Sequence, residues 1–399
     1  MLEGVNVALG VSGSIAAVKT VELAHELRRQ GADVRAVLTE SARGIIHPWA
    51  LEFATEADVV TEITGGVEHV ELCGYDGWAD VLLLAPTTAN TLGKIAAAVD
   101  DTPVTTCATT AIGAETPVVI APAMHEPMSN HPGVLEAIET VEDWGVDFVD
   151  PRVEEGKAKV ASERAIVTDV ARAAGERPLE GTHVVVTSGA TAEAIDPIRV
   201  VTNRSSGRMG RAVARACYVR GADVTLVHGL VGPRPFTGGA TAPDDVPAAT
   251  VRSVESASEM LAATREACTD ADALVSAAAI GDYTLESSPE KIRSGQELTL
   301  ELEATPKLID EIREERPSLP VVGFKAETSG DEAEMIEQAR TTLERAGLAF
   351  VVANDAGVMG GEETRALLVH AEDVARYEGS KAGLAGEIAD SVAAIVGDS

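Results

Sequence analysis

The sequence is poor in cysteine, lysine and aromatic residues, and it has no long apolar run. No stretch approaches the roughly 20 apolar residues that a membrane helix needs, so we predict no transmembrane segment. Residues 1–10 lack the basic start of a secretory signal and have the pattern of a strand instead. The four cysteines (Cys73, Cys107, Cys217 and Cys268) form no CxxC pair. This argues against a zinc or disulfide scaffold and favours the reducing cytoplasm.

Positive charge is also scarce, with 32 basic residues against 64 acidic ones and a net charge of −32. A chain without a basic stripe has nothing to offer the phosphates of a nucleic acid, so we expect no nucleic-acid partner. The acidic residues are spread along the chain instead of forming one tail. We interpret this as adaptation to high salt, where screening makes a highly charged surface tolerable. An ordinary acidic enzyme is the alternative.

Two parts of the chain share one strand–turn–helix–strand pattern. In the first, the apolar run Val5–Leu9 enters a Gly/Ser turn, a helix extends to Gln30, and Asp33–Leu38 is a strand. In the second, His183–Thr187 begins the pattern again, and the helix after its turns is expected at Arg211–Arg220. This repeat predicts an α/β fold of two tandem three-layer Rossmann- or flavodoxin-like domains with mainly parallel sheets.

The boundary between the domains is expected near residues 174–178, where glycine and proline end a helix. We therefore predict a first domain at 1–178 and a second at 179–399. In the first domain, small polar residues follow the first two predicted strands, where a helix N-terminus can hold a phosphate. They are Ser12, Gly13, Ser14, Thr39 and Ser41.

Four motifs of the first domain resemble those of the homo-oligomeric flavin-containing cysteine decarboxylases. They are GVSGSIAAVK (10–19), HVEL (69–72), PTTANT (86–91) and PAMHEPM (122–128). The resemblance implies an FMN site formed by Ser12, Gly13, Ser14, Thr39, Ser41, Pro86, Thr87, Thr88, Asn90 and Met124. It also implies that His69 is the catalytic base near the thiol of a cysteinyl substrate. Taken alone, His69 has the ordinary interpretation of a solvated loop histidine.

Two positions depart from the decarboxylase pattern. His125 stands where the family has an asparagine that binds the substrate carboxylate, and an imidazole can also bond a carboxylate. The family's flap carries a cysteine that protonates the intermediate, whereas VEEGKAKV (153–160) has none. Lys157 and Lys159 are candidates for that proton donor or for the basic residue of the flap. Solvated surface charge is the alternative for both.

In the second domain, SSGRMG (205–210) at a helix start is suited to cradle a diphosphate, which allows an NAD(P)-dependent oxidoreductase. However, the first strand lacks a GxxxGxG turn and no Tyr-xxx-Lys motif occurs. TSGAT (187–191), DPIR (196–199) and TNRSSGRMG (202–210) resemble instead the motifs of phosphopantothenate–cysteine ligases. Further motifs of that family follow in order as far as Asp355, so the two resemblances together span nearly the whole chain.

The resemblance to the ligases implies a role for each of these segments. Asn203 would handle an acyl-nucleotide intermediate, and the turn Ser205, Ser206, Gly207 would hold a substrate phosphate. Asp282 and Lys291 would contact the nucleotide, with Mg2+ at its triphosphate. The other implied substrate-site positions are Ala278, Pro306, Lys307, Leu308, Ile309, Phe324, Thr342 and Ala346.

Thr342 and Ala346 lie where the ligases have lysines, so this chain departs from the family there. Arg340, Arg345 or Lys325 could compensate. CTP is therefore the expected nucleotide, and ATP is the alternative.

Together the two resemblances imply consecutive steps towards coenzyme A in a cytoplasmic enzyme. With the salt adaptation inferred from the acidic composition, we expect its source to be a halophilic archaeon. Cysteine would be joined to 4′-phosphopantothenate, and the product would be decarboxylated to 4′-phosphopantetheine. The families imply a homo-oligomer, with trimeric flavin domains and dimeric ligase domains. A ligase fused to a regulatory flavoprotein is an alternative, since the flap cysteine is missing. A flavin prenyltransferase-like domain is a weaker one.

Overall fold

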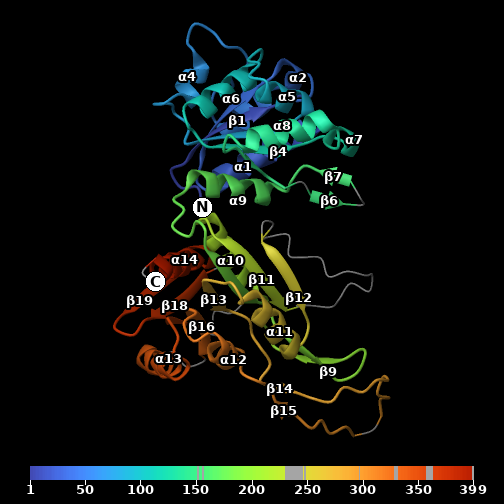
Figure 1. The fold of residues 1–399 in the computed structure, drawn as a ribbon, viewed down its shortest axis with the longest axis vertical. Helices are drawn as coiled ribbons and strands as arrows, with labels where there is room; N and C mark the ends of the chain where they lie inside the picture. Colours follow the sequence, from blue (N-terminus) through green and yellow to red (C-terminus); the bar gives the residue numbers. More distant parts are fainter. Residues whose placement is uncertain are drawn as a thin grey trace. The chain divides into compact units, whose positions relative to one another are not determined.

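The computed structural model describes residues 1–150, 152–154, 157–229, 246, 249–295, 297–327, 331–355 and 363–397 (Figure 1). For 152–154, 157–159, 326, 327, 355 and 363 it describes the backbone alone. The chain divides into two compact units, Met1–Glu176 and Arg177–Ser399. Among the described residues, no helix combines the length and apolar character that crossing a bilayer requires.

Unit 1 is built on a five-stranded parallel sheet in the order β2–β1–β3–β4–β5. Its strands are β1 (Asn6–Val11), β2 (Asp33–Leu38), β3 (Val81–Thr87), β4 (Val118–Pro122) and β5 (Asp147–Phe148). The central strand β3 is buried along its whole length, as its uninterrupted apolar sequence predicts. The order is that of flavodoxin-like folds, in which ligands bind where the strand order reverses, between β1 and β3.

Helices cover both faces of this sheet. On one face, side chains of α4, α5, α6 and α8 form a core cluster with Ala8, Leu82 and Ile120. On the other face lie η1, α1, α3 and α9, and α1 turns Leu23, Ala24 and Leu27 inward at helical spacing. The bounds are η1 (Ile15–Lys19), α1 (Thr20–Arg29), α2 (Glu40–Arg43), α3 (Pro48–Thr55), α4 (Glu68–Cys73), α5 (Ala89–Ala96), α6 (Pro103–Gly113), α7 (Glu126–Ser129), α8 (Pro132–Glu142) and α9 (Glu163–Ala174), with a hairpin of β6 (Arg152–Glu154) and β7 (Lys157–Lys159) before α9.

Unit 2 contains an eight-stranded sheet in the order β12–β11–β8–β13–β16–β17–β18–β19. The first six strands are parallel in the Rossmann order, and β18 and β19 continue the sheet antiparallel. They are β8 (His183–Ser188), β11 (Asp223–Gly229), β12 (Thr250–Val254), β13 (Ala273–Ser276), β16 (Val321–Glu327), β17 (Phe350–Asp355), β18 (Glu363–Val369) and β19 (Val374–Ser380). Both sheets confirm the predicted α/β class.

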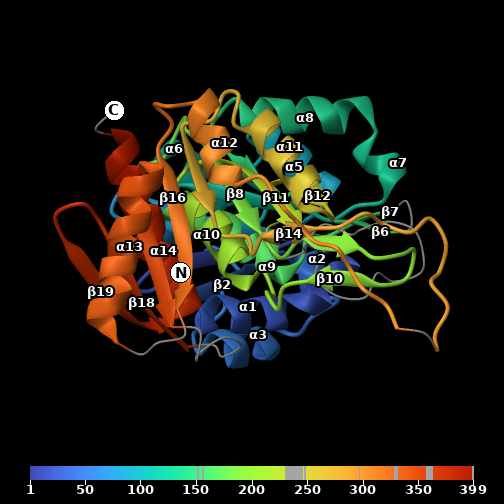
Figure 2. The same ribbon diagram turned by 90° about the horizontal axis from the view of Figure 1, so that it is seen from below.

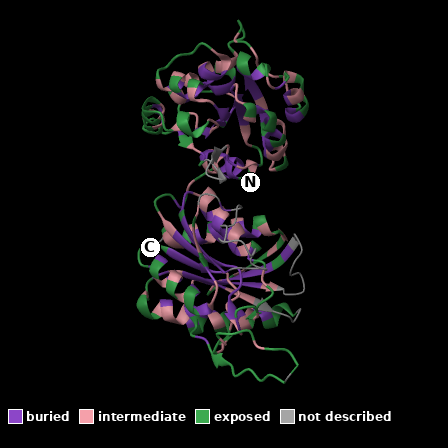
Figure 3. Ribbon diagram, turned by 90° about the vertical axis from the view of Figure 1, so that its right-hand side faces the viewer, coloured by how far each residue is buried: buried purple, intermediate pink, exposed green. Residues whose placement is uncertain are grey.

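The layers of unit 2 follow from the alternation of side chains along its strands. Val184, Val186 and Phe350 pack beneath α10 (Arg208–Val219) and α14 (Lys381–Gly397) on one face. The opposite face is covered by α11 (Ala257–Ala267), α12 (Leu308–Glu315) and α13 (Glu332–Ala346). Figure 3 shows buried residues concentrated in the central strands of each unit.

Two short ribbons extend beyond the sheet of unit 2. The hairpin of β9 (Ala192–Ala194) and β10 (Val200–Thr202) lies between β8 and α10, and β14 (Tyr283–Thr284) pairs with β15 (Glu303–Ala304). Figure 2 shows β10 beside the segment that leads from β14. The sequence-based start of α10 at Arg211 is wrong by one turn. Gly207, at φ +68°, ends the preceding turn, so the helix begins at Arg208.

The four cysteines are free and buried. Burial raises the pKa of Cys217 and of Cys268 to about 12. The contact with Cys73, and then burial, raise the pKa of Cys107.

We therefore predict that iodoacetamide at pH 8 labels none of the four thiols in the native protein and all four after denaturation. Because the folded pKa values of Cys107, Cys217 and Cys268 are raised, the contribution of these three thiols to stability is complete below about pH 8.5 and declines as the pH rises towards 12. Unfolding midpoints at pH 8 and pH 10 measure this decline. Rapid labelling of Cys217 in the folded protein would contradict the prediction.

Candidate functional site

The turns after β1 and β3 in unit 1 are joined through Ser12. The Ser12 hydroxyl donates to the Pro86 carbonyl (2.7 Å) and accepts from the Thr88 N–H (3.0 Å). The backbone N–H of Ser12 also donates to Pro86 (3.2 Å). Ser12, Pro86 and Thr87 are buried, and Thr88 caps α5 by accepting from the Thr91 N–H. These hydrogen bonds hold the turns after β1 and β3 in a fixed position relative to each other.

The turns after β2 and β4 meet the turn after β1. A Cβ on Gly13 would lie 2.4 Å from Ser41 Oγ, so only glycine allows this approach. Ser41 Oγ is in turn 3.1 Å from Thr39 Oγ1. The Ser14 hydroxyl donates to the Ala123 carbonyl at 3.4 Å and caps the start of η1. The turns after β1, β2, β3 and β4 thus meet at one edge of the sheet, next to the start of η1.

Three expected residues lie at the rim of this edge. Asn90 is exposed in the first turn of α5, and Met124 is half-buried after β4. His125 is exposed at the start of α7, and its side chain makes no capping hydrogen bond there. His125 thus lies exposed three residues beyond the carboxyl end of β4.

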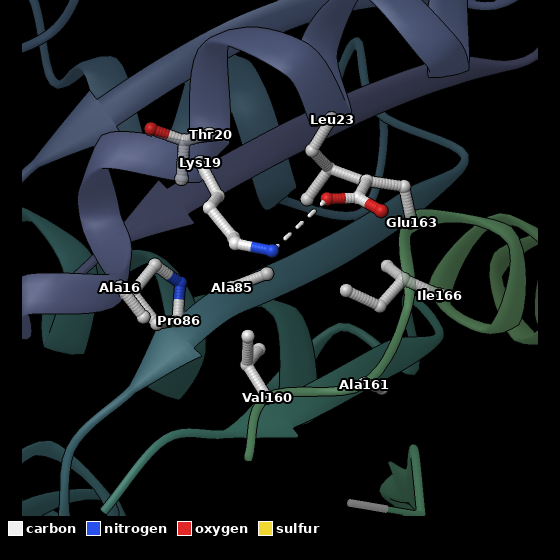
Figure 4. Close-up of a pocket in the computed structure, with 10 residues that line it drawn as sticks. All are labelled: Ala16, Lys19, Thr20, Leu23, Ala85, Pro86, Val160, Ala161, Glu163 and Ile166. Atoms are coloured by element: carbon white, nitrogen blue, oxygen red, sulfur yellow. Dashed lines mark ion pairs between the residues drawn. The ribbon is translucent and has the colours of Figure 1, made fainter. Parts of the chain in front are cut away.

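A small pocket lies behind the Pro86 turn (Figure 4). It is lined by Ala16, Lys19, Thr20, Leu23, Ala85, Pro86, Val160, Ala161, Glu163 and Ile166, and Lys19 Nζ is 3.8 Å from Glu163 Oε1 across it. Val160 directly follows β7. The hairpin that carries Lys157 and Lys159 therefore joins the protein next to Pro86, although the side chains of both lysines lie outside the described part of the structure.

His69 lies elsewhere in unit 1. It is half-buried on α4, which packs on α6, and its Nδ1 is enclosed without a hydrogen-bond partner among the described residues. Figure 1 shows α4 and α7 on opposite sides of this unit. One copy of the chain therefore does not bring His69 to His125 and Met124.

In unit 2, three glycines let the strand-end turns pack together. Gly189 has φ +84°, and a Cβ there would lie 2.3 Å from the Gly229 carbonyl oxygen. A Cβ on Gly207 would lie 2.9 Å from the Cα of Gly189. The Ser188 hydroxyl donates to the Gly207 carbonyl at 2.9 Å. These contacts place the start of α10, with Ser205 and exposed Ser206 before it, at the carboxyl ends of β8 and β11.

Asn203 joins the turn after β13 to this edge. Its side-chain amide donates to the Ala279 carbonyl (3.1 Å), and the Ala279 N–H donates to Gly189 (2.9 Å). The neighbouring Ala278 N–H donates to the Thr187 hydroxyl at 3.2 Å. Asn203, the turn at Ala278 and the start of α10 are thus brought together at the switch point between β8 and β13.

Asp282 and Lys307 form an exposed ion pair, with Nζ 2.5 Å from Oδ1. Thr305 binds the same turn, since its hydroxyl donates to the Gly281 carbonyl at 2.6 Å. Pro306, exposed between Thr305 and Lys307, belongs to this group. The expected residues 282, 306 and 307 are therefore neighbours.

Lys291 is exposed and does not lie with Asn203. It precedes Ile292, whose backbone is bonded to Asp196 and Arg199 at the tip of the β9–β10 hairpin, whereas Asn203 follows the base of that hairpin. The Arg199 guanidinium, followed by backbone N–H groups, holds the pKa of the Asp196 carboxyl well below its ordinary value. The pair therefore stays ionised at neutral pH, and its contribution to stability is lost only as the pH falls below about 4.

The remaining expected residues are divided between the two faces of the sheet. Phe324 packs on the α10–α14 face, whereas Leu308 is buried and Ile309 packs on the opposite face. Thr342 lies on α13 with its hydroxyl bonded to the Gln338 carbonyl, and Ala346 is buried in the core. The Lys325 ammonium donates to Gln338 at 2.9 Å, one helical turn before Thr342.

Asn354 is a residue that the motif analysis did not assign to the site. It follows Phe350 and Val352 at spacing two, on the strand face that also carries Phe324 on β16. Its Oδ1 is buried and lacks a hydrogen-bond partner among the described residues. The sequence signal that could have indicated this residue was its position at the end of strand β17, among the last of the ligase-like motifs.

Two family models match the chain. Residues 1–175 match the model described as Flavoprotein, and residues 179–396 match the model described as DNA/pantothenate metabolism flavoprotein C-terminal domain. These matches define a flavoprotein joined to a pantothenate-metabolism domain.

The chain is 50% identical over 372 residues to the coenzyme A biosynthesis bifunctional protein CoaBC of Thermococcus kodakarensis, covering 92% of this chain and 89% of that protein. It is 35% identical to the CoaBC protein of Methanocaldococcus jannaschii, covering 99% and 95%. A crystal structure of the C-terminal domain of a CoaBC protein is 28% identical, with a TM-score of 0.46, and covers 56% of this chain and 100% of that one. The chain belongs to the family of bifunctional CoaBC proteins of coenzyme A biosynthesis.

Substitution of Gly13 tests the phosphate-site geometry of unit 1. We predict that Gly13→Ala lowers the flavin content of the purified protein severalfold, because the added methyl group collides with Ser41. Gly93→Ala, on α5 where a Cβ meets nothing within 4 Å, is the matched control and should keep its flavin. The flavin absorbance relative to protein measures both. Equal flavin content in Gly13→Ala and the wild type would contradict the geometry.

Proposed function

We propose that the chain joins cysteine to 4′-phosphopantothenate in unit 2 and decarboxylates the product to 4′-phosphopantetheine in unit 1. The single observation that carries this proposal is the similarity to bifunctional CoaBC proteins along almost the whole chain. The product of the first step is the substrate of the second, which gives a reason for both domains in one chain. Each sheet also has glycine-containing turns and a helix start at its carboxyl edge, which supports the binding of substrates with one phosphorylated arm.

The carboxyl edge of unit 1 fits FMN. Gly13 and Ser41 would contact its phosphate, and Ser12 and Ser14, whose hydroxyls donate to Pro86 and Ala123, would hold the turn in place. When bound, FMN would take two electrons from the cysteinyl thiol, which makes loss of carbon dioxide easy, and would return them afterwards, so that the reaction has no net oxidation. The unpartnered Nδ1 of His69 fits a group that accepts or returns the thiol proton.

Two side chains would complete the decarboxylation site. His125 would bind the substrate carboxylate, because its imidazole sits at the start of α7 without a capping bond. Lys157 or Lys159 would return a proton to the product, as their hairpin ends at Val160, which lines the same pocket as Pro86. Replacing each lysine by alanine distinguishes the two.

Unit 2 would activate the pantothenate carboxylate as an acyl-nucleotide and transfer it to cysteine. Ser205, Ser206 and the start of α10 would hold a phosphate, and Asn203 beside them would bind the activated acyl group. Phe324 and Asn354 share the sheet face of α10, where the Asn354 oxygen can accept from a base or ribose. The hairpin between β8 and α10 departs from a dinucleotide fold and disfavours an NAD(P) oxidoreductase.

CTP is the nucleotide that we propose, with Mg2+ bound mainly through the triphosphate. Among the described residues, no cluster of three or more His, Cys, Asp or Glu side chains forms a metal site of its own. A metal held by phosphates and one carboxylate, such as Asp282, agrees with this. Lys325 would supply positive charge near Thr342, where the ligases resembled by this chain have lysine.

We propose that the protein is a homo-oligomer, with trimeric flavin units and dimeric ligase units. Trp49 and Phe53 lie one turn apart on α3 and are 74% and 76% exposed, an unusual pair for a free surface. A second copy would also complete the decarboxylase site, since α4, which carries His69, and α7, which begins directly after His125, lie on opposite sides of unit 1. In unit 2, exposed apolar side chains lie on the two ribbons and their approaches: Ile198, Val200, Val201, Tyr283, Leu298, Leu300 and Leu302.

We also propose that the enzyme works in the cytoplasm of a halophile. The net charge of −32 supports this, because high salt screens the repulsion among surface carboxylates. The assays below are therefore carried out in concentrated KCl.

The direct test supplies 4′-phosphopantothenate, cysteine, Mg2+ and either CTP or ATP to the purified protein, with products identified by mass spectrometry. Formation of 4′-phosphopantetheine by a yellow protein is the expected result, with CTP preferred. Accumulation of phosphopantothenoylcysteine would mean that unit 1 is a regulatory flavoprotein. Absence of ligation with either nucleotide would refute the proposal for unit 2.

Separate variants assign the two steps. We predict that His69→Asn keeps its flavin and its ligase activity but decarboxylates at least about 100-fold more slowly, because it lacks the base. Asn203→Ala should show the reverse pattern, losing ligation while decarboxylating supplied phosphopantothenoylcysteine normally. Product ratios from each variant measure this. Decarboxylation by His69→Asn at the wild-type rate would exclude His69 as the base.

The proposed assembly predicts that Phe53→Asp lowers the molar mass in light scattering and impairs decarboxylation, because charge on α3 opposes contact between copies. Leu135→Asp is the matched control, since it adds the same charge at a half-exposed leucine on α8. If both variants keep the wild-type mass and activity, the α3 surface is not an interface.

A further inference from the structure

One ion pair, between a buried aspartate and a partly exposed arginine, binds both the backbone N–H and the carbonyl of a single distant residue. Asp196 is completely buried, and its Oδ1 accepts from the N–H groups of Ile198 and Arg199, each at 2.9 Å. Its Oδ2 accepts from Arg199 Nε (2.9 Å) and the Ile292 N–H (3.1 Å), and also contacts Arg199 Nη2. That Nη2 donates to the Ile292 carbonyl at 2.7 Å. The pair therefore fixes the peptide groups on both sides of Ile292.

The segment before Ile292 is bound to the same hairpin along its length. The Thr284 hydroxyl donates to the buried Glu193 carboxylate at 2.9 Å, and the Ser288 N–H donates to the Ile195 carbonyl at 3.0 Å. These bonds attach residues 284–292 to β9 and the turn after it (Figure 2). The last attachment is directly next to Lys291, whose own side chain is exposed.

The chemistry of the Asp196–Arg199 pair suits it to fixing the backbone at Ile292. An ion pair with a buried member adds little to the free energy of folding compared with apolar residues of similar size, so we attribute to this pair a role in positioning the backbone. The planar guanidinium can bond a carboxylate and a carbonyl at the same time, which an ammonium cannot do in the same fork. A long lysine side chain loses less entropy on binding an anion when its backbone is already fixed.

We infer that Asp196 and Arg199 are positioning residues that fix the backbone at Ile292, and through it the place from which Lys291 presents its ammonium to a phosphate-bearing substrate. This inference rests on the proposed ligase function. Asp196 acts through Arg199 and Ile292 and does not touch the substrate. The phosphate belongs either to the nucleotide or to phosphopantothenate, and separate titrations of the two substrates distinguish them.

A double-mutant cycle in the full-length protein tests the inference. An asparagine at 196 has one acceptor oxygen for donors on two sides, so Asp196→Asn should release Ile292. We expect Asp196→Asn and Lys291→Met each to raise the KM for one of the two substrates about tenfold, and the double variant to show no further increase. If the double variant instead raises the KM by the product of the two single increases, Asp196 acts independently of Lys291 and the inference is overturned.

Two further variants separate positioning from general stability. Arg199→Lys keeps a positive charge beside Asp196 but loses the fork, and should show the same rise in KM with an unfolding midpoint near that of the wild type. Asp390→Asn breaks the bidentate pair with Arg220 between α10 and α14 (2.5 and 2.7 Å) and should leave both KM values unchanged. An equal effect of Asp390→Asn would reduce Asp196 to an ordinary stabilising residue.

Amide hydrogen exchange provides a readout without catalysis. The Ile292 N–H should exchange slowly in the wild type and in Asp390→Asn, and at least about tenfold faster in Asp196→Asn. If the Ile292 N–H exchanges in Asp196→Asn at the wild-type rate, Asp196 does not fix the backbone at Ile292 and the inference is overturned. An active wild type whose KM values are unaffected by Lys291→Met would overturn the role given to Lys291. If the wild type shows no ligation but its Ile292 N–H exchanges slowly, the proposed function is refuted, while the bonds of Asp196 and Arg199 to Ile292 are still supported.

Discussion

Both units depend on backbone segments that approach one another more closely than a Cβ allows. In unit 1 the turn after β1 presses Gly13 against Ser41, and in unit 2 Gly189 is held between Gly207 and Gly229. These approaches bring strand-end N–H groups, hydroxyls and helix starts to one edge of each sheet. Side chains placed there would collide with the neighbouring turn. The absence of a side chain at a few positions therefore allows the strand-end turns of each unit to meet.

Two groups proposed to act in the reactions, His69 and Lys291, do not lie at the strand ends. His69 lies on α4, on the other side of unit 1 from α7, and Lys291 lies at the tip of the hairpin whose base leads to Asn203. In a single copy, these two groups lie apart from the strand-end turns. Exposed apolar side chains on α3 and on the ribbons of unit 2 give a physical reason to expect contacts between copies.

The ion pair at Asp196 shows how a polar interaction can order a segment outside the core. Residues 284–292 contribute few buried apolar side chains, so packing alone does not fix their path. Backbone bonds to β9 and to the Asp196–Arg199 pair do so instead. In a chain with twice as many acidic as basic residues, a fully paired and buried aspartate marks a position where geometry is required.

Much of the fold was predictable because its signals are local. Apolar strands such as Val81–Thr87, the turns that follow them and the amphipathic α1 can be read within short windows, and the ordered motifs identified both families. The start of α10 was placed one turn late, because a positive φ at Gly207 leaves no distinct mark in the sequence.

The sequence by itself determined the α/β class, the strand-end turns and the residue types available for catalysis, since these depend on neighbours along the chain. Only the tertiary structure decided that Asp196 binds Ile292 across 96 positions, that Ala346 is buried, and that Phe324 and Leu308 lie on opposite faces of one sheet. Such relations depend on strand order and on which face each side chain takes, and no short window of sequence contains that information.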